Sequence, residues 1–268
     1  MDAAVPPDGP VRLGTVQLPA GSRISGGQDE PLLWATSALV ADAGLVWLEL
    51  NDLHGQTGLA PILLAYLDRG DAGEGRPWDS GELHDRIDLS EVDRLDPAGV
   101  LAQSWADSLD PDDDDPEQAE MVASFSFRFP GLAPRQNDEL SRADLERSLR
   151  TLPAARIGLV PASRPADMLA LVGYNGTVNR YGSPALLSAV LKSWEDRFGS
   201  IVLEVGFDHI RLLVRRPPRT RQAAEATAAE IWAMCDEFWM AERPEALTYV
   251  SEIADYVRGA PFWTLWLD

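Results

Sequence analysis

The chain has 268 residues and a formal net charge of −20, because 43 acidic residues outnumber 23 basic ones. Its length fits one large domain or two small ones. The excess of negative charge argues against direct binding to nucleic acid or to an anionic membrane, because both repel a polyanion. One cysteine and three histidines exclude a disulfide framework or a multi-cysteine metal site, so we expect no metal and no cofactor.

The N-terminal residues lack both the basic segment and the apolar run of a signal peptide. The longest apolar stretches, Leu59 to Leu67 and Ile210 to Val214, are too short to span a bilayer. We therefore expect a cytoplasmic protein without membrane contact. The lone thiol of Cys235 suits such a reducing compartment.

The negative charge is distributed unevenly along the chain. Residues 1–150 carry a net charge of −18, whereas residues 151–268 carry only −2. This asymmetry suggests two regions with different roles, although solubility alone would also explain it. We predict a flexible N-terminal segment at residues 1–30, an acidic α+β region at residues 31–151 and a C-terminal domain at residues 152–268.

The early elements follow from the spacing of apolar residues. A short strand at the edge of a sheet is predicted within Val11–Leu18, and a helix over Leu39–Leu53. The compact apolar run Pro61–Leu67 is typical of a buried strand. Together they predict a mixed α/β arrangement for the acidic region.

Two helices are predicted from their N-terminal caps. Asp96-Pro97 places a favoured N-cap and a favoured first residue before a helix that ends near Leu109. Ser141 to Asp144 resembles a capping box and starts a helix through Leu149. Between them, Phe125–Phe129 alternates apolar and polar residues as a half-buried strand would.

The C-terminal domain has the most regular pattern. Its predicted order is β-α-α-β-β-α-α-β, which favours an α+β fold around a small, mostly antiparallel sheet. The elements are a strand at Arg156–Val160, a short helix at Pro165–Val172, a helix from Ser183 to Phe198, hairpin strands at Ile201–Val205 and Ile210–Val214, a long helix at Thr220–Ala241, a helix from Pro244 to about Arg258 and a strand at Phe262–Leu267.

Four segments of this domain carry a resemblance: Ile157–Pro161, Leu186–Gly199, Val205–Phe207 and Gly259–Trp266. They are similar to the bacterial family called domain of unknown function 4253. Three segments of the first half look like those that accompany this domain in longer members: Thr57–Leu64, Arg76–Glu82 and Phe129–Pro134. The resemblance supports a boundary near residue 152 and implies no catalytic residue.

Two motifs invite a ligand interpretation that their spacing does not support. Asp110 begins an acidic run like a calcium loop, but the sixth and twelfth positions hold Asp115 and Met121 instead of Gly and Glu. The run therefore favours a solvated linker. Three glycines at positions 70, 73 and 75 follow an apolar run, but they match no phosphate-binding spacing.

Seven residues are candidates for contact with a ligand or a partner. They are Trp78, Asp79, Glu82, Glu195, Asp196, Arg197 and His209. The first three lie on a long loop, where an aromatic side chain beside carboxylates suits contact, or where the indole simply fills a gap between the halves. The next three end a predicted helix, and either line a groove or are merely exposed. The histidine lies at a predicted hairpin turn.

Two classes of function remain open. The first is a protein-interaction module of immunity or inhibitor type, because an acidic chain without a catalytic motif suits a basic protein partner. The second is an enzyme or a small-ligand-binding protein with a site in the cleft between the two halves. The sequence leaves open the substrate or reaction, the partner's identity and the oligomeric state.

Overall fold

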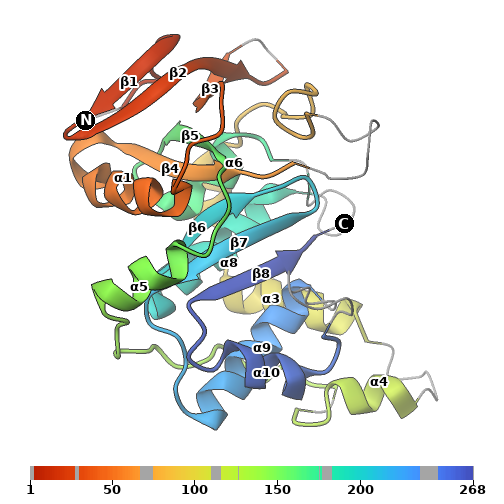
Figure 1. Cartoon of the computed structure of the whole chain (residues 1–268). Helices are drawn as coiled ribbons and strands as arrows, with labels where there is room; N and C mark the ends of the chain where they lie inside the picture. Colours follow the sequence, from red (N-terminus) through yellow and green to blue (C-terminus); the bar gives the residue numbers. More distant parts are fainter. Residues whose placement is uncertain are drawn as a thin grey trace.

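The computed structural model describes residues 3–27, 30–66, 75–109, 116–125, 127–174, 176, 183–235 and 247–267. Its strands are β1 (Gly9–Leu13), β2 (Val16–Ser25), β3 (Pro31–Thr36), β4 (Leu59–Leu64), β5 (Arg156–Pro161), β6 (Ser200–Val205), β7 (His209–Val214) and β8 (Phe262–Trp266). They form an eight-stranded sheet in the order β1-β2-β3-β5-β4-β6-β7-β8 (Figure 1). All neighbours are antiparallel except β4 and β6, which are parallel.

Helices cover the two faces of the sheet unequally. They are α1 (Ala43–Thr57), α2 (Leu89–Asp93), α3 (Pro97–Asp107), α4 (Pro116–Met121), α5 (Arg142–Leu149), the 3-10 turn η1 (Pro165–Asp167), α6 (Met168–Leu171), α8 (Pro184–Phe198), α9 (Arg221–Met234) and α10 (Val250–Val257). The larger core lies between one face and α3, α6, α8, α9 and α10. The smaller core lies between the other face and α1 with α5.

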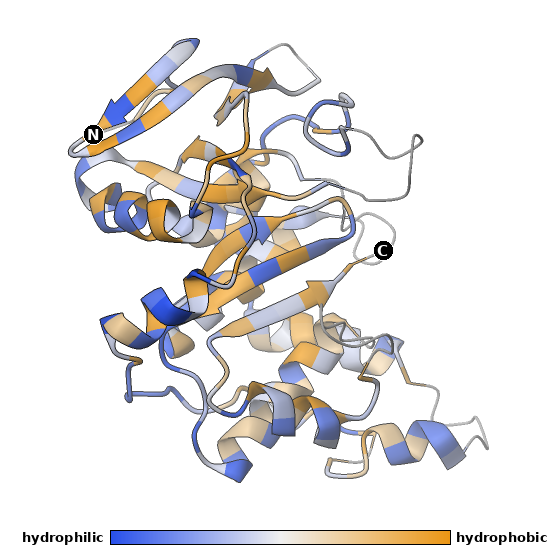
Figure 2. Cartoon of the chain, in the orientation of Figure 1, coloured by the Kyte–Doolittle hydropathy of each residue, from blue (hydrophilic) through white to orange (hydrophobic). Residues whose placement is uncertain are grey.

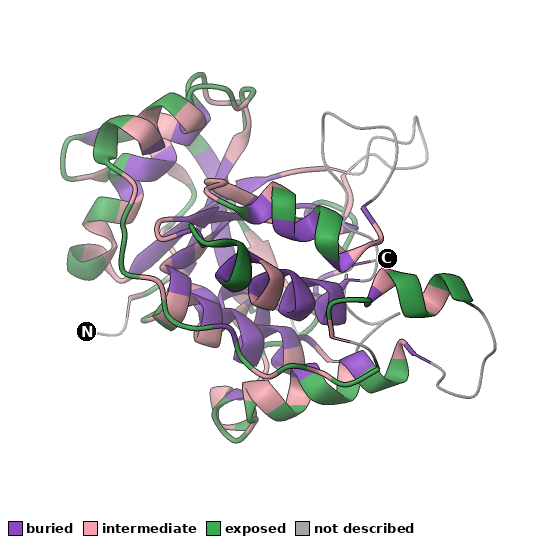
Figure 3. Cartoon of the chain, turned by 90° about the horizontal axis from the view of Figure 1, so that it is seen from below, coloured by how far each residue is buried: buried purple, intermediate pink, exposed green. Residues whose placement is uncertain are grey.

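Hydropathy and burial follow this layering. Hydrophobic residues are concentrated in the strands, and hydrophilic residues on the outer sides of the helices (Figure 2). Buried residues fill the central helices, whereas exposed residues lie on the peripheral ones (Figure 3). No helix in the described part of the chain combines the length and the apolar character that crossing a membrane requires.

The capping residues start the helices where the sequence predicts. The Asp96 carboxylate accepts hydrogen bonds from the backbone N–H groups of Ala98 and Gly99 at 3.3 and 3.1 Å. Ser141 and Ser183 cap α5 and α8 in the same way. Side-chain caps of this kind satisfy backbone donors that have no partner within the helix.

The predicted α+β class is confirmed, and the C-terminal elements occur in the predicted order. However, their strands do not form a small sheet of their own. β5 lies between β3 and β4, and β4 pairs with β6, so both regions contribute to one sheet. The boundary near residue 152 stays a prediction about the sequence, and it does not coincide with a separation in space.

Three local predictions differ from the structure. The first 30 residues supply the hairpin β1–β2, where we expected a flexible segment with one edge strand. The described residues of Phe125–Phe129 form turns and no strand, because Phe125 packs on the larger core and Phe129 contacts Trp105 at 5.9 Å between ring centroids. The predicted long helix ends at Met234, and residues 236–246 lie outside the described part.

Candidate functional site

A β-bulge places a carboxylate on the less covered face of the sheet. Val202 pairs with Leu212 and Glu204 pairs with Arg211, so Leu203 is an extra residue in β6. A bulge changes which side chains share a face. Leu203 belongs to the smaller core, and Glu204 contacts the Arg211 side chain on that same face.

Polar side chains from three strands form a row beside this bulge. Arg211 pairs with Glu204 on one side and with Thr264 of β8 on the other. Its Nε donates to Thr264 Oγ1 at 3.4 Å, and its Nη1 lies 3.4 Å from Glu204 Oε1. His209 Nε2 lies 3.4 Å from the same Glu204 oxygen. The row thus presents an acid and two basic groups within one small area.

This row forms the floor of a cavity of about 410 Å³, which we call the sheet groove. The lining residues are Ala65, Thr151, Leu152, Pro153, Glu204, His209, Arg211, Tyr256, Phe262 and Thr264. The first four come from the acidic region and from the boundary that follows α5, whereas the others belong to the C-terminal part. The groove therefore lies between the two regions, and its volume falls within the range of small-molecule sites.

Two carboxylates hold the imidazole of His209 in the charged form. Burial alone would lower its pKa, but hydrogen bonds with Asp208 at 2.8 Å and with Glu204 raise the pKa of His209 to about 9. Burial opposes the charge of Glu204 as well, and its hydrogen bond with His209 and the charge of Arg211 keep its pKa below the usual value. At neutral pH the His209 imidazole is therefore positively charged, and it lies between the carboxylates of Asp208 and Glu204.

Gly206 provides the space for this imidazole. It follows β6, and its backbone N–H donates to the His209 carbonyl at 2.8 Å to close the hairpin. A Cβ at position 206 would lie 2.5 Å from His209 Cε1. A side chain there would displace the ring, so the turn and the charge cluster depend on the same glycine.

The loop candidates lie near the same end of the sheet. Trp78 is only 2% exposed, and its Nε1 donates to the carbonyls of Ala65 at 3.0 Å and Val205 at 3.3 Å, just past β4 and at the end of β6. Asp79 Oδ2 accepts from Arg156 at 2.7 Å. The indole therefore acts as a packing group that joins two parallel strands, and direct partner contact by Trp78 stays a prediction.

Glu82 stabilises the same loop through Arg76. Arg76 Nε lies 2.7 and 2.8 Å from the two carboxylate oxygens, and hydrogen bonding from this guanidinium keeps the pKa of Glu82 below its usual value. The Arg76 guanidinium also lies over the Phe207 ring, 3.6 Å from its centroid. This contact links the loop to the turn that carries His209.

The remaining three candidates lie at the opposite end of β6, because α8 precedes that strand. Glu195 and Asp196 both bind Arg164, at 3.1 and 2.6 Å. Arg197 forms a bidentate ion pair with Glu230, with distances of 2.7 and 2.5 Å. The six residues of β6 correspond to roughly 20 Å of extended chain, so these residues and His209 do not share one site.

Glu230 is the centre of that second cluster. It is completely buried, and it accepts from Trp194 Nε1 at 2.8 Å and from the Ala133 backbone N–H at 2.5 Å, besides Arg197. These partners join α8, α9 and the loop that follows α4. Four strong bonds on one buried carboxylate indicate a structural role for Arg197.

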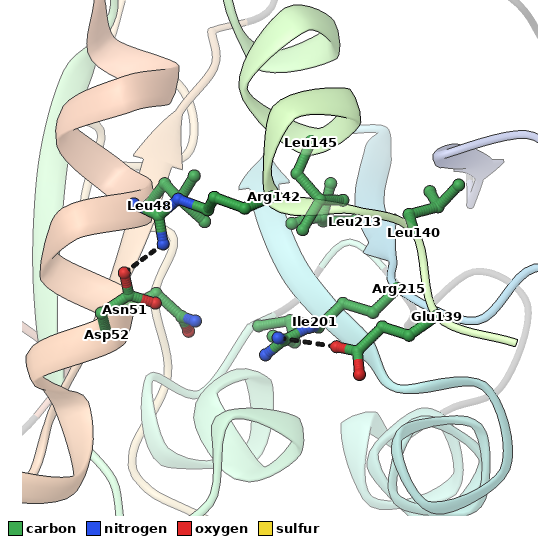
Figure 4. A pocket seen from close by; sticks show the side chains of 10 residues that line it. All are labelled: Leu48, Asn51, Asp52, Glu139, Leu140, Arg142, Leu145, Ile201, Leu213 and Arg215. Carbon is green, nitrogen blue, oxygen red and sulfur yellow. Dashed lines mark hydrogen bonds and ion pairs between the residues drawn. The ribbon is translucent and has the colours of Figure 1, made fainter. Parts of the chain in front are cut away.

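A second cavity, of about 270 Å³, lies on the same sheet face between α1, α5 and the strands β6 and β7 (Figure 4). Arg142 of α5 bridges to Asp52 of α1, and Arg215 binds Glu139 at 2.7 Å. The Arg215–Glu139 pair thus joins the C-terminal part to the first half of the chain. Arg211 and Arg221 pair within the C-terminal part, with Glu204 and Glu225.

Exposed carboxylates gather on α2, α3 and α4. Residues 85–120, here called the acidic segment, contain thirteen acidic and two basic residues, a net charge of −11. The run Asp110–Asp115 lies outside the described residues. The described carboxylates of this segment are all exposed: Asp85, Asp88, Glu91, Asp93, Asp96, Asp107, Glu117 and Glu120.

Two observations show the character of this surface. Partial desolvation, together with the charges of Glu117, Glu120 and Glu252, raises the pKa of Tyr249. Carboxylates of α4 and of α10 therefore both contribute to the negative potential at the Tyr249 hydroxyl. Phe127 and Leu132, which follow α4, are 37% and 39% exposed. Exposed apolar and acidic side chains thus follow one another along this stretch of the chain, and both kinds occur in protein interfaces.

Sequence reasoning missed Glu204, Arg211 and Glu230 as site residues. Each is a charged residue in an apolar element, which is the signal that could have found them. Their partners are distant in sequence or depend on a bulge, so the pairing itself was not visible. Among the described residues, no group of three or more His, Cys, Asp or Glu side chains has the arrangement of a metal site.

Fold and surface together define an α+β protein with one mixed sheet, an open sheet groove and an acidic outer segment. Residues 156–268 match the family described as domain of unknown function DUF4253, which confirms the resemblance of the C-terminal part. Comparisons with curated proteins and with solved structures found no match. The family description assigns no activity, so function must be argued from the molecule itself.

Proposed function

We propose that this protein is an interaction module of immunity or inhibitor type, and that it binds a basic protein partner through its acidic segment. One observation carries the proposal. The eight described carboxylates of the segment are exposed, whereas Arg164, Arg197 and Arg211 of the C-terminal part pair with carboxylates of that same part.

The arrangement of charge favours a role in association. Like charges on one surface repel one another and destabilise the compact state, so this density of exposed carboxylates does not serve to stabilise the fold. The same charges create a field that accelerates encounter with a basic surface and disfavours acidic competitors. Inhibitors of basic enzymes use this combination of speed and selectivity.

The apolar residues next to α4 complete the proposed interface. Charges at an interface rim mainly set the association rate, whereas buried apolar anchors slow dissociation. Among the described residues, Phe127 and Leu132 are the exposed large hydrophobic side chains nearest in sequence to α4. We expect the acidic segment to steer the partner and these two residues to hold it.

A capture experiment with matched variants tests the proposal. The segment variant carries Glu91→Gln, Asp107→Asn, Glu117→Gln and Glu120→Gln, which avoids the helix caps. The control variant carries Asp42→Asn, Glu49→Gln, Asp138→Asn and Asp255→Asn, all exposed and all outside the segment. Both change the net charge by the same amount.

Each tagged protein is incubated with native lysate at low and at high salt, and bound proteins are identified by mass spectrometry. We expect wild type and control to retain one basic partner in stoichiometric amount at low salt, and the segment variant to lose it. Equal retention by the segment variant contradicts the proposal. So does the absence of any basic partner at low salt.

A further inference from the structure

The sheet groove contains charged groups that are held close to one another but not in close contact. Four contacts converge on Glu204 and Arg211, and each measures 3.4 or 3.5 Å. Charge-assisted hydrogen bonds are normally 2.7–2.9 Å long. By contrast, the ion pair of Arg197 with the buried Glu230 is closed at 2.5–2.7 Å.

Such long contacts leave hydrogen-bonding capacity for a ligand. Sites of this kind often show long polar contacts when empty and shorten them when occupied. The strands fix Glu204, Arg211 and Thr264 side by side in a cross-strand row. The polar groups are therefore already oriented, which lowers the entropic cost of binding.

The charge balance of the groove selects the chemistry of the ligand. The lining places the Glu204 carboxylate beside the basic side chains of His209 and Arg211, and Asp208, outside the lining, pairs with His209 at 2.8 Å. An anion would approach Arg211 but face the Glu204 carboxylate, and a cation would approach Glu204 but face the two basic groups. A ligand with one positive and one negative group, close together, satisfies both sides.

We propose that the sheet groove binds a small dipolar ligand of the free amino-acid type, with its carboxylate on Arg211 and its ammonium group on Glu204. Thr264 Oγ1 lies beside the guanidinium and supplies a further polar contact. Leu152, Pro153 and Phe262 line the rest of the groove and provide an apolar wall for the ligand side chain. This site is independent of the proposed acidic interface.

Three probes that share a phenyl group on a short carbon chain test whether binding needs the positive charge, the negative charge or both. L-Phenylalanine carries both charges, phenethylamine carries only the positive one, and 3-phenylpropionate carries only the negative one. Isothermal titration of the full chain is expected to show saturable binding of L-phenylalanine or of L-leucine. The two singly charged analogues are expected to bind at least about tenfold more weakly, because each leaves one charged group without a partner.

Variants place the binding in the groove. Arg211→Gln and Glu204→Gln should each abolish amino-acid binding, whereas Arg215→Gln, in the second cavity of the same sheet face, should leave it unchanged. Should the first two fail to fold, Thr264→Val and Leu152→Trp alter the groove without removing a charge, and both should weaken binding. The proposal is overturned if neither amino acid binds at millimolar concentration, if the singly charged analogues bind equally well, or if these groove variants bind as wild type does.

Discussion

Carboxylates have different roles in the C-terminal part of this molecule and in its acidic segment. In the C-terminal part, Glu230 and Glu204 lie inside the structure and contact arginines from neighbouring elements. In the acidic segment the described carboxylates are exposed, and Asp93 pairs with Lys192 at 2.7 Å. The same chemical group therefore stabilises one region and gives the other an external electric field.

The largest expected change in the free energy of unfolding comes from removing the buried carboxylate of Glu230. Glu230→Ala removes the carboxylate and leaves the Arg197 charge buried without its partner, which costs roughly 3–5 kcal/mol. Glu91→Ala, on the exposed face of α2, should change stability by no more than about 0.5 kcal/mol. Urea unfolding of both variants checks the difference. Similar values for the two would contradict the division of roles.

The second effect depends on pH and concerns His209. Its pKa is raised from 6.5 in the unfolded chain to about 9 in the folded protein by Asp208 and Glu204, which outweigh desolvation. The charged imidazole therefore stabilises the fold fully below pH 6.5, and this contribution is lost as pH rises through about 9. The shift corresponds to at most about 3 kcal/mol.

The His209→Gln variant isolates that contribution. Its unfolding free energy should fall below that of wild type at pH 6, and the two should converge near pH 10. His84→Gln, on an exposed residue, is the control and should follow wild type throughout. A constant difference between wild type and His209→Gln across this range would show that packing, and not charge, is what His209 supplies.

A smaller change in stability tests whether the two hydrogen bonds of the Trp78 indole stabilise the sheet. Trp78→Phe removes the donor to Ala65 and Val205 and should cost about 1–2 kcal/mol beyond the lost volume. Trp105 offers a matched control, because its buried Nε1 has no hydrogen-bond partner among the described residues. Trp105→Phe should therefore lose only volume and ring contacts. If Trp78→Phe costs no more than Trp105→Phe, the two carbonyl contacts do not stabilise the sheet.

Local signals in the sequence predicted much of the fold. The cap at Asp96, the caps at Ser141 and Ser183 and the apolar spacing of the hairpin each depend on neighbours within a few residues. The strand expected at Phe125–Phe129 failed for a related reason. Its alternation reflects two aromatic rings that pack on other elements, and periodicity alone cannot distinguish that from a strand.

The candidate sites were less accessible to prediction. His209 was expected at a hairpin turn, and the structure places it directly after that turn, as the first residue of β7. The bulge at Leu203 that brings Glu204 beside it has no local signature. The insertion of β5 between β3 and β4 depends on pairing across more than 90 residues. Arg197 was chosen as a candidate for contact, and its partner Glu230 lies 33 residues away.

The most direct measurement of the central claim is the association rate with the captured partner at increasing ionic strength. The account predicts that the rate for wild type and for the control variant falls steeply with salt, since screening removes long-range attraction. The segment variant should associate on the order of tenfold more slowly at low salt, with a shallower dependence. A rate that ignores salt, or that is the same for the segment variant and for the control, would contradict the role of the acidic segment.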